Sequence, residues 1–226
     1  LSFQRTDAGH VLGLYDMDRE QILSIKECPA LIPELQDLLK ELDKYPPPID
    51  RASIRLRVNP HGQRGLWIDA SNLDIRTLLN ERKWLKYWMQ DAHIEMGQRR
   101  KYVQTLGDGL SLEAPMQRQW FSTFHPIDNR EYPLWSVVGG FSQPSVKGVK
   151  VLVAKIFALI QQHSLQDRWL EFGSGAGTFT LPISTMVSSI VATETSKLAR
   201  EGLVTAAKLA KLSNISVSSL NLQRCT

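Results

Sequence analysis

The sequence has few of the features that mark secreted and membrane-embedded proteins. Its 226 residues include only two cysteines, Cys28 and Cys225, which cannot form a disulfide scaffold. No apolar run approaches the roughly 20 residues that a membrane-spanning helix needs, and the first residues lack the pattern of a signal peptide. We therefore expect a cytoplasmic protein with no membrane partner.

Excess charge of either sign is small. The chain has 27 lysines and arginines against 23 acidic residues, a formal net charge of +4 at pH 7. This mildly basic balance permits a nucleic-acid partner without requiring one. With 42% hydrophobic residues the chain can bury a sizeable core, and its length favours two domains.

The two ends of the sequence lack what a complete domain would have. There is no initiator methionine, and residues 1–5 already read as part of a strand. Residues 216–226 follow what looks like a third strand of a parallel sheet, whereas a doubly wound domain has about five strands or more. We therefore expect the chain to be a fragment of a longer protein.

The most informative stretch is 169–183, WLEFGSGAGTFTLPI, which predicts a short strand, a glycine turn and the start of a helix. The apolar side chains of Trp169, Leu170 and Phe172 suit a buried parallel strand. A helix beginning beyond Gly177 would direct free N–H groups and the positive end of its dipole toward a ligand at the turn.

Within this stretch Gly173, Gly175 and Gly177 allow a tight turn and leave bare main chain against which a ligand can lie. The next predicted strand ends in Glu194, at the edge where open α/β sheets bind ligands, so its carboxylate could accept hydrogen bonds from both ribose hydroxyls. NAD and S-adenosylmethionine both fit. Thr178 occupies the position of the third glycine of G-x-G-x-x-G, which favours S-adenosylmethionine. A purely structural turn, with a solvated acid, is the alternative.

The pattern before this stretch predicts a different kind of domain. Three short alternating segments in 1–25 predict an antiparallel meander, leucines at helical spacing in 31–42 predict a helix, and 54–69 predicts a hairpin. We expect an α/β protein in which an α+β central domain with an antiparallel sheet, residues 1–130, precedes a partial Rossmann-like domain, residues 131–226.

Basic residues gather at two places in the expected central domain. Arg55 and Arg57 lie on one face of a predicted strand, and Arg99, Arg100 and Lys101 form a cluster next to an aromatic residue. Together they could contact the phosphates of RNA, which makes the central domain the RNA-facing part. A solvated strand face is the alternative interpretation.

Several of these residues together resemble one family, the class I S-adenosylmethionine-dependent RNA uracil-C5 methyltransferases. Phe141-Ser142-Gln143 is similar to the family's F-x-Q segment, and 170–182, LEFGSGAGTFTLP, is similar to its glycine motif. The resemblance implies that Gln143 contacts the cofactor, that Glu194 holds the ribose and that Asn221 lies beside the adenine. The glycine motif departs from the family at Gly173, Ser174 and Thr178.

The resemblance also bears on both cysteines. The segment KECPAL is similar to one in which iron–sulfur members of the family carry the last of four cluster ligands. Cys28 could therefore hold a 4Fe-4S cluster only in the full-length parent, because the other three cysteines are absent here. The family's nucleophilic Cys, which adds to C6 of uracil, and its general base belong to segments that the sequence lacks. Cys225 is not that nucleophile, so we predict no catalytic residue in this chain.

The resemblance implies an S-adenosylmethionine-dependent methyltransferase that acts on uracil C5 of tRNA or rRNA, with RNA as partner. We expect a monomer, and we expect the fragment alone to be inactive. Two alternatives stay open, an NAD-binding oxidoreductase domain and a non-catalytic RNA-binding relative.

Overall fold

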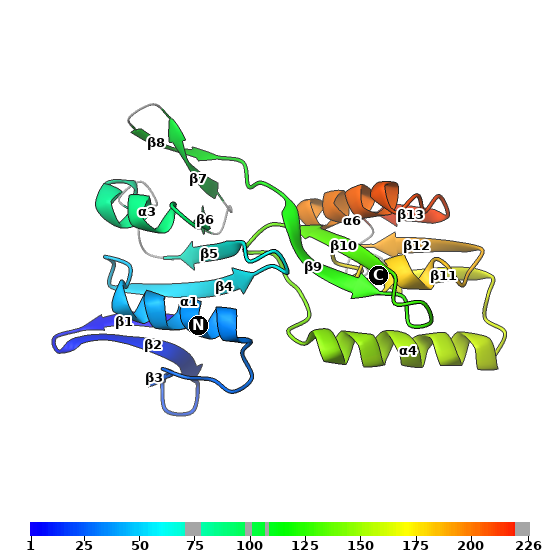
Figure 1. The fold of residues 1–226 in the computed structure, drawn as a ribbon, viewed down its shortest axis with the longest axis horizontal. Helices are drawn as coiled ribbons and strands as arrows, with labels where there is room; N and C mark the ends of the chain where they lie inside the picture. Colours follow the sequence, from blue (N-terminus) through cyan, green and yellow to red (C-terminus); the bar gives the residue numbers. More distant parts are fainter. Residues whose placement is uncertain (71–77, 98–100, 107–108, 220–226) are drawn as a thin grey trace, which may run out of the picture. The chain divides into compact units, whose positions relative to one another are not determined.

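The computed structural model describes residues 1–70, 78–97, 101–106 and 109–219 (Figure 1). The chain forms two compact units, Leu1–Met116 and Gln117–Thr226. The division lies earlier than the boundary expected near residue 130. The reason is that β9 (Arg118–Phe124) pairs along its length with β10 (Glu131–Ser136), and β10 packs against a helix of the second unit.

The first unit is built on one mixed sheet of eight strands in the order β3-β2-β1-β4-β5-β6-β7-β8 (Figure 1). The strands are β1 (Ser2–Thr6), β2 (Gly9–Asp16), β3 (Gln21–Ser24), β4 (Arg51–Val58), β5 (Arg64–Asp69), β6 (Ala92–Met96), β7 (Lys101–Leu106) and β8 (Gly109–Glu113). The predicted meander and hairpin are confirmed as β1–β3 and β4–β5. Only β5 and β6 pair in parallel.

Two helices of the first unit join the same apolar core. The predicted leucine helix is confirmed as α1 (Pro33–Lys44), which begins with a proline, the residue whose missing N–H costs nothing at that position. Between the parallel strands β5 and β6 lies α3 (Arg82–Trp88), which buries Leu85 and Trp88. Both helices pack on the sheet face that carries Ile54 and Ile68. The exposed side chains of β4 lie on the opposite face.

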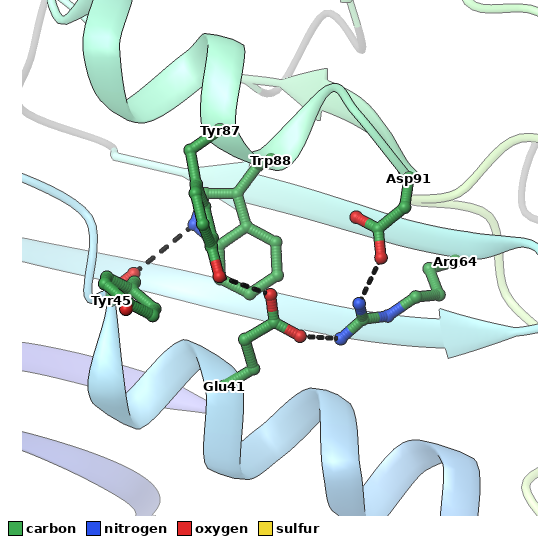
Figure 2. A network of polar contacts seen from close by, with 6 residues as sticks. All are labelled: Glu41, Tyr45, Arg64, Tyr87, Trp88 and Asp91. Atoms are coloured by element: carbon green, nitrogen blue, oxygen red, sulfur yellow. Dashed lines mark hydrogen bonds and ion pairs between the residues drawn. The ribbon is translucent and has the colours of Figure 1, made fainter.

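A polar network fastens the two helices to the sheet (Figure 2). The guanidinium of Arg64, at the start of β5, donates to Glu41 of α1 and to Asp91, which follows α3. The hydroxyl of Tyr87 on α3 donates to the other oxygen of Glu41 at 2.8 Å. This hydrogen bond, with burial and the nearby charge, raises the pKa of Tyr87 to about 12. The pKa of Glu41 is lowered, because the bonds from Arg64 and Tyr87 outweigh its desolvation.

The second unit contains a parallel sheet in the order β11-β12-β13 beside the β9–β10 hairpin (Figure 1). Its remaining elements are α4 (Val146–Gln162), β11 (Arg168–Phe172), α5 (Thr180–Ile183), β12 (Ser189–Thr193), α6 (Lys197–Leu209) and β13 (Ile215–Ser218). Ser145 caps the N-terminus of α4, because its hydroxyl accepts a hydrogen bond from the N–H of Gly148. Within the described part of the chain, none of the helices is long and apolar enough to span a membrane.

One expectation for this unit was wrong. Leu170 and Phe172 of β11 are 53% and 50% exposed. All three helices pack on the opposite face of the sheet, where Trp169 and Ile190 point, and no element within residues 117–219 covers Leu170 and Phe172. The helix expected after Gly177 is confirmed as α5, but it is a single turn and contributes little dipole to the glycine turn.

Candidate cofactor site

The backbone turn that follows β11 requires its three glycines for two different reasons. All three have left-handed φ values, +69° at Gly173, +57° at Gly175 and +97° at Gly177. A Cβ added at Gly173 or Gly175 would meet no atom within 4 Å, whereas one at Gly177 would lie 2.5 Å from Leu203. The first two glycines therefore leave open space beside bare main chain, and the third allows close packing against α6.

Hydrogen bonds to neighbouring strands hold this turn in place. The N–H of Ser174 donates to the carbonyl of Thr193, at the end of β12, at 3.0 Å. On the other side, the hydroxyl of Thr123 in β9 donates to the carbonyl of Thr178 at 2.7 Å. Hydrogen bonds thus hold the turn on two sides, so its backbone is already ordered for ligand binding.

Glu194 connects the glycine turn to the start of α6. One carboxylate oxygen accepts the N–H of Gly175 at 3.0 Å, and the other accepts the N–H of Ser196 at 2.7 Å. Ser196 caps the N-terminus of α6, and Arg200 in the first turn of that helix donates to the backbone carbonyl of Glu194 at 2.6 Å. A carboxylate has about four acceptor positions, so both oxygens keep capacity to accept from a pair of hydroxyls.

A buried hydroxyl at the turn has no protein partner within the described residues. Ser174 is 4% exposed, and its Oγ makes no hydrogen bond there. Buried polar groups are almost always paired, so an orphan of this kind indicates an unseen partner. The open space at Gly173 and Gly175, this hydroxyl and the Glu194 carboxylate together fit an adenosyl ligand with a polar amino-acid end.

A second carboxyl group beneath the turn was not predicted from the sequence. Glu171 of β11 is half-buried, and the hydroxyl of Thr180 donates to it at 2.6 Å. Burial raises the pKa of Glu171, although the Thr180 hydrogen bond opposes this shift. The sequence signal was available, because an acid in the middle of an apolar strand needs a polar partner.

The remaining cofactor and metal predictions are only partly placed by the structure. Gln143 lies half-buried in the connection between β10 and α4, and Asn221 lies outside the described residues. Cys28 lies before α1, and its N–H donates to the side chain of Gln36 at 2.8 Å. Among the residues that the structure describes, no group of three or more His, Cys, Asp or Glu side chains could hold a metal ion.

The predicted basic residues have different environments. Arg55 is exposed on β4, but Arg57 on the same strand is only 4% exposed, so its guanidinium is not on the surface where phosphates would bind. Lys101 begins β7 and is half-buried. Arg99 and Arg100 lie outside the described residues.

Comparison with known proteins identifies relatives over most of the chain. The sequence model of the tRNA (uracil-5-)-methyltransferase family matches residues 69–225. An uncharacterized RNA methyltransferase of Bdellovibrio bacteriovorus is 41% identical over 192 residues, which are 85% of this chain and 49% of that protein. A tRNA/tmRNA (uracil-C(5))-methyltransferase of Wolinella succinogenes is 26% identical over 90% of this chain and 53% of its own length. The chain therefore spans about half the length of these curated relatives.

A solved structure supports the fold assignment. The Pyrococcus abyssi tRNA (uracil-54, C5)-methyltransferase, solved with S-adenosyl-L-homocysteine, superposes with a TM-score of 0.58 and 13% sequence identity. The alignment covers 97% of this chain and 54% of that one. The chain thus has an α/β fold of the class I methyltransferase type, as predicted.

Proposed function

The chain belongs to the tRNA (uracil-5-)-methyltransferase family, and from this premise we propose that the whole protein transfers a methyl group from S-adenosylmethionine to C5 of a uridine in RNA. The observation that carries the proposal is the pairing of the Glu194 carboxylate with the N–H of Gly175. The contact supports the proposal because it holds a carboxylate, the group that would accept hydrogen bonds from a ribose, beside a glycine turn with open space for a ligand. The present chain contributes this cofactor-holding part.

Each residue of the site has a distinct role in the proposal. The turn 173–178 packs its bare main chain against the amino-acid end of the cofactor, and Gln143 orients that end. Glu194 accepts hydrogen bonds from the ribose hydroxyls, while Asn221, assigned from the sequence alone, contacts the adenine edge. When bound, the cofactor supplies a methyl group activated by its sulfonium. Ser174 offers a hydroxyl to its polar end.

RNA is the proposed partner, through the first unit. The exposed guanidinium of Arg55 supports this assignment, as phosphate contacts require an accessible cation. Lys101, Arg99 and Arg100 remain candidates from the sequence. A tRNA or an rRNA substrate, a monomeric state and a cytoplasmic location belong to the proposal on sequence grounds alone, as does a 4Fe-4S cluster ligated by Cys28 in the full-length parent.

Calorimetric titration of the chain with S-adenosylhomocysteine and with NADH tests the cofactor class. We expect binding of S-adenosylhomocysteine and a loss of about 1.5–3 kcal/mol, roughly ten- to a hundredfold in affinity, in Glu194→Ala. Glu201→Ala, an acid on the outside of α6, is the matched control and should bind as the wild type does. The proposal would be refuted if the chain bound NADH but not S-adenosylhomocysteine, or if Glu194→Ala left the affinity for S-adenosylhomocysteine unchanged.

A further inference from the structure

Aromatic side chains are exposed in the first unit where the end of α1 lies beside α3. Tyr45, the residue after α1, is 41% exposed, and Tyr87 on α3 is 36% exposed. The centres of the two rings are 4.6 Å apart, and their planes are tilted by 41°. Trp84 lies three residues before Tyr87, on the same side of α3, and is half-buried. These three side chains are called here the aromatic patch.

Hydrogen bonds hold the aromatic patch in position. The hydroxyl of Tyr87 donates to Glu41 of α1 at 2.8 Å (Figure 2), so this side chain offers mainly its ring to a partner. The backbone carbonyl of Tyr45 accepts the indole N–H groups of Trp84 at 3.1 Å and of Trp88 at 3.3 Å. Because these bonds order the Tyr87 side chain and the Tyr45 backbone in advance, a ligand would lose little affinity to the ordering of the patch.

Positive charge surrounds the aromatic patch. The ammonium of Lys44 lies 5.2 Å from the centre of the Tyr45 ring. Lys83 lies one helical turn before Tyr87, on the same side of α3. The cations of α3 are all exposed, and they are Arg82, Lys83 and Lys86. Within the described part of the chain, neither Lys44 nor these three residues form an ion pair.

The nearby acids do not cancel this charge. Glu41 and Asp91 are bonded to the guanidinium of Arg64, and the segment 81–90 contains one acid, Glu81. Counted with Lys44 and the α3 cations, the region has five cations against three acids. The surplus favours an anionic partner.

Exposed rings beside exposed lysines fit a single-stranded nucleic acid better than a protein partner. Aromatic faces stack unpaired bases of any sequence, and lysines contact the phosphates between those bases. A proline-rich peptide also lies on aromatic side chains, but it makes no use of the cations. Lys44 can leave the Tyr45 ring for a phosphate, because an exposed cation–π contact is weak.

We propose that Tyr45 and Tyr87 stack an unpaired base of the RNA, with Lys44 and Lys83 on the adjoining phosphates. The inference rests on the proposed function in taking RNA as the partner, but not on the cofactor site. It adds an RNA contact on the helical side of the first unit, apart from Arg55, which lies on the opposite face of the sheet. The first unit then holds the substrate by base stacking as well as by its phosphates.

Fluorescence anisotropy with a 5′-fluorescein-labelled uridine octamer tests the stacking. Tyr45→Ala should weaken binding about tenfold, because one stacking surface is lost. Tyr45→Phe and Tyr87→Phe keep the rings and should bind as the wild type does. A blunt-ended RNA duplex has no unpaired base, so Tyr45→Ala should leave its affinity unchanged. An unchanged octamer affinity in Tyr45→Ala, or an equal loss for octamer and duplex, would overturn the proposal.

The salt dependence of octamer binding tests the phosphate contacts. Lys83→Gln should reduce the slope of log affinity against log salt by about 0.7, since one phosphate contact is lost. Lys208→Gln, at an exposed lysine of α6, is the matched control and should leave the slope unchanged. A slope that is the same in Lys83→Gln and in the wild type would contradict the phosphate contact.

Photocrosslinking locates the base directly. An octamer with one 5-iodouridine should form adducts on the peptides that contain Tyr45 or Tyr87. Adducts confined to other peptides, such as those of β4, would overturn the proposal while leaving RNA as the partner, and displacement of the octamer by octaproline would indicate a peptide site instead. Titration with S-adenosylhomocysteine is the separate readout of the cofactor site. Loss of octamer binding in Tyr45→Ala with that titration unchanged supports the aromatic patch on its own.

Discussion

Replacing Arg64 by alanine should destabilise the first unit by about 2–3 kcal/mol at pH 7. The Arg64 side chain is 18% exposed and bonds two carboxylates, Glu41 at 27% and Asp91 at 50% exposure. A charge-assisted hydrogen bond contributes about 1.5–3 kcal/mol when shielded from water, and an exposed ion pair contributes about 0–1 kcal/mol. We therefore assign most of the loss to the Glu41 contact and little to Asp91.

The pH dependence separates this interaction from simple loss of packing. The pKa of Glu41 is lowered in the folded protein, in part because Arg64 donates to it. A lowered carboxylate pKa gives stability that is fully present above the unfolded pKa and is lost as pH falls through the folded pKa. The difference between wild type and Arg64→Ala should therefore shrink on acidification, from its full value at pH 7.

Urea denaturation followed by circular dichroism measures both quantities. The series compares the wild type with Arg64→Ala, Glu41→Gln and the double variant at pH 7 and at about pH 3, with Arg82→Ala as the exposed control. We expect the double-mutant cycle to give a coupling energy of about 1.5 kcal/mol or more at pH 7. A coupling below about 0.5 kcal/mol, or a destabilisation by Arg64→Ala that is equal at both pH values, would refute this account of the network.

Two further predictions concern the cofactor site. Gly177→Ala should destabilise the second unit by about 1–3 kcal/mol, because the added Cβ would lie 2.5 Å from Leu203 in a left-handed backbone. Thermal unfolding of this variant is compared with that of Gly173→Ala. The Gly173→Ala variant adds no clash, so it should lose less stability. Glu171→Gln should stabilise the protein at pH 7 and not at pH 4. Burial raises the pKa of Glu171 in the folded protein, so the wild type loses stability as pH rises through that pKa and the carboxyl group ionises. The glutamine variant has no such loss. Urea midpoints of Glu171→Gln and wild type that stay equal at both pH values would count against a buried, destabilised carboxylate.

Local patterns predicted those features that depend on neighbouring residues in the sequence. The meander, the leucine helix and the hairpin follow from side-chain periodicity, which records which face of an element is apolar. The glycine turn follows in the same way, since Gly173, Gly175 and Gly177 stand where φ is positive. The family was identifiable because its glycine motif is a contiguous run of residues.

What the sequence alone determined was thus the elements, their order, the turn and the family. Only the tertiary structure decided which side chains are buried, because burial depends on what packs against each face. Arg55 and Arg57 lie two residues apart on the same face of β4, yet Arg55 is exposed and Arg57 is buried. Leu170 looked like core but is exposed, because α4, α5 and α6 all pack on the other face of the sheet. The contact of Glu194 with Gly175 likewise joins residues 19 positions apart. Side-chain periodicity cannot specify such a contact, but the parallel pairing of β11 with β12 brings the two residues together.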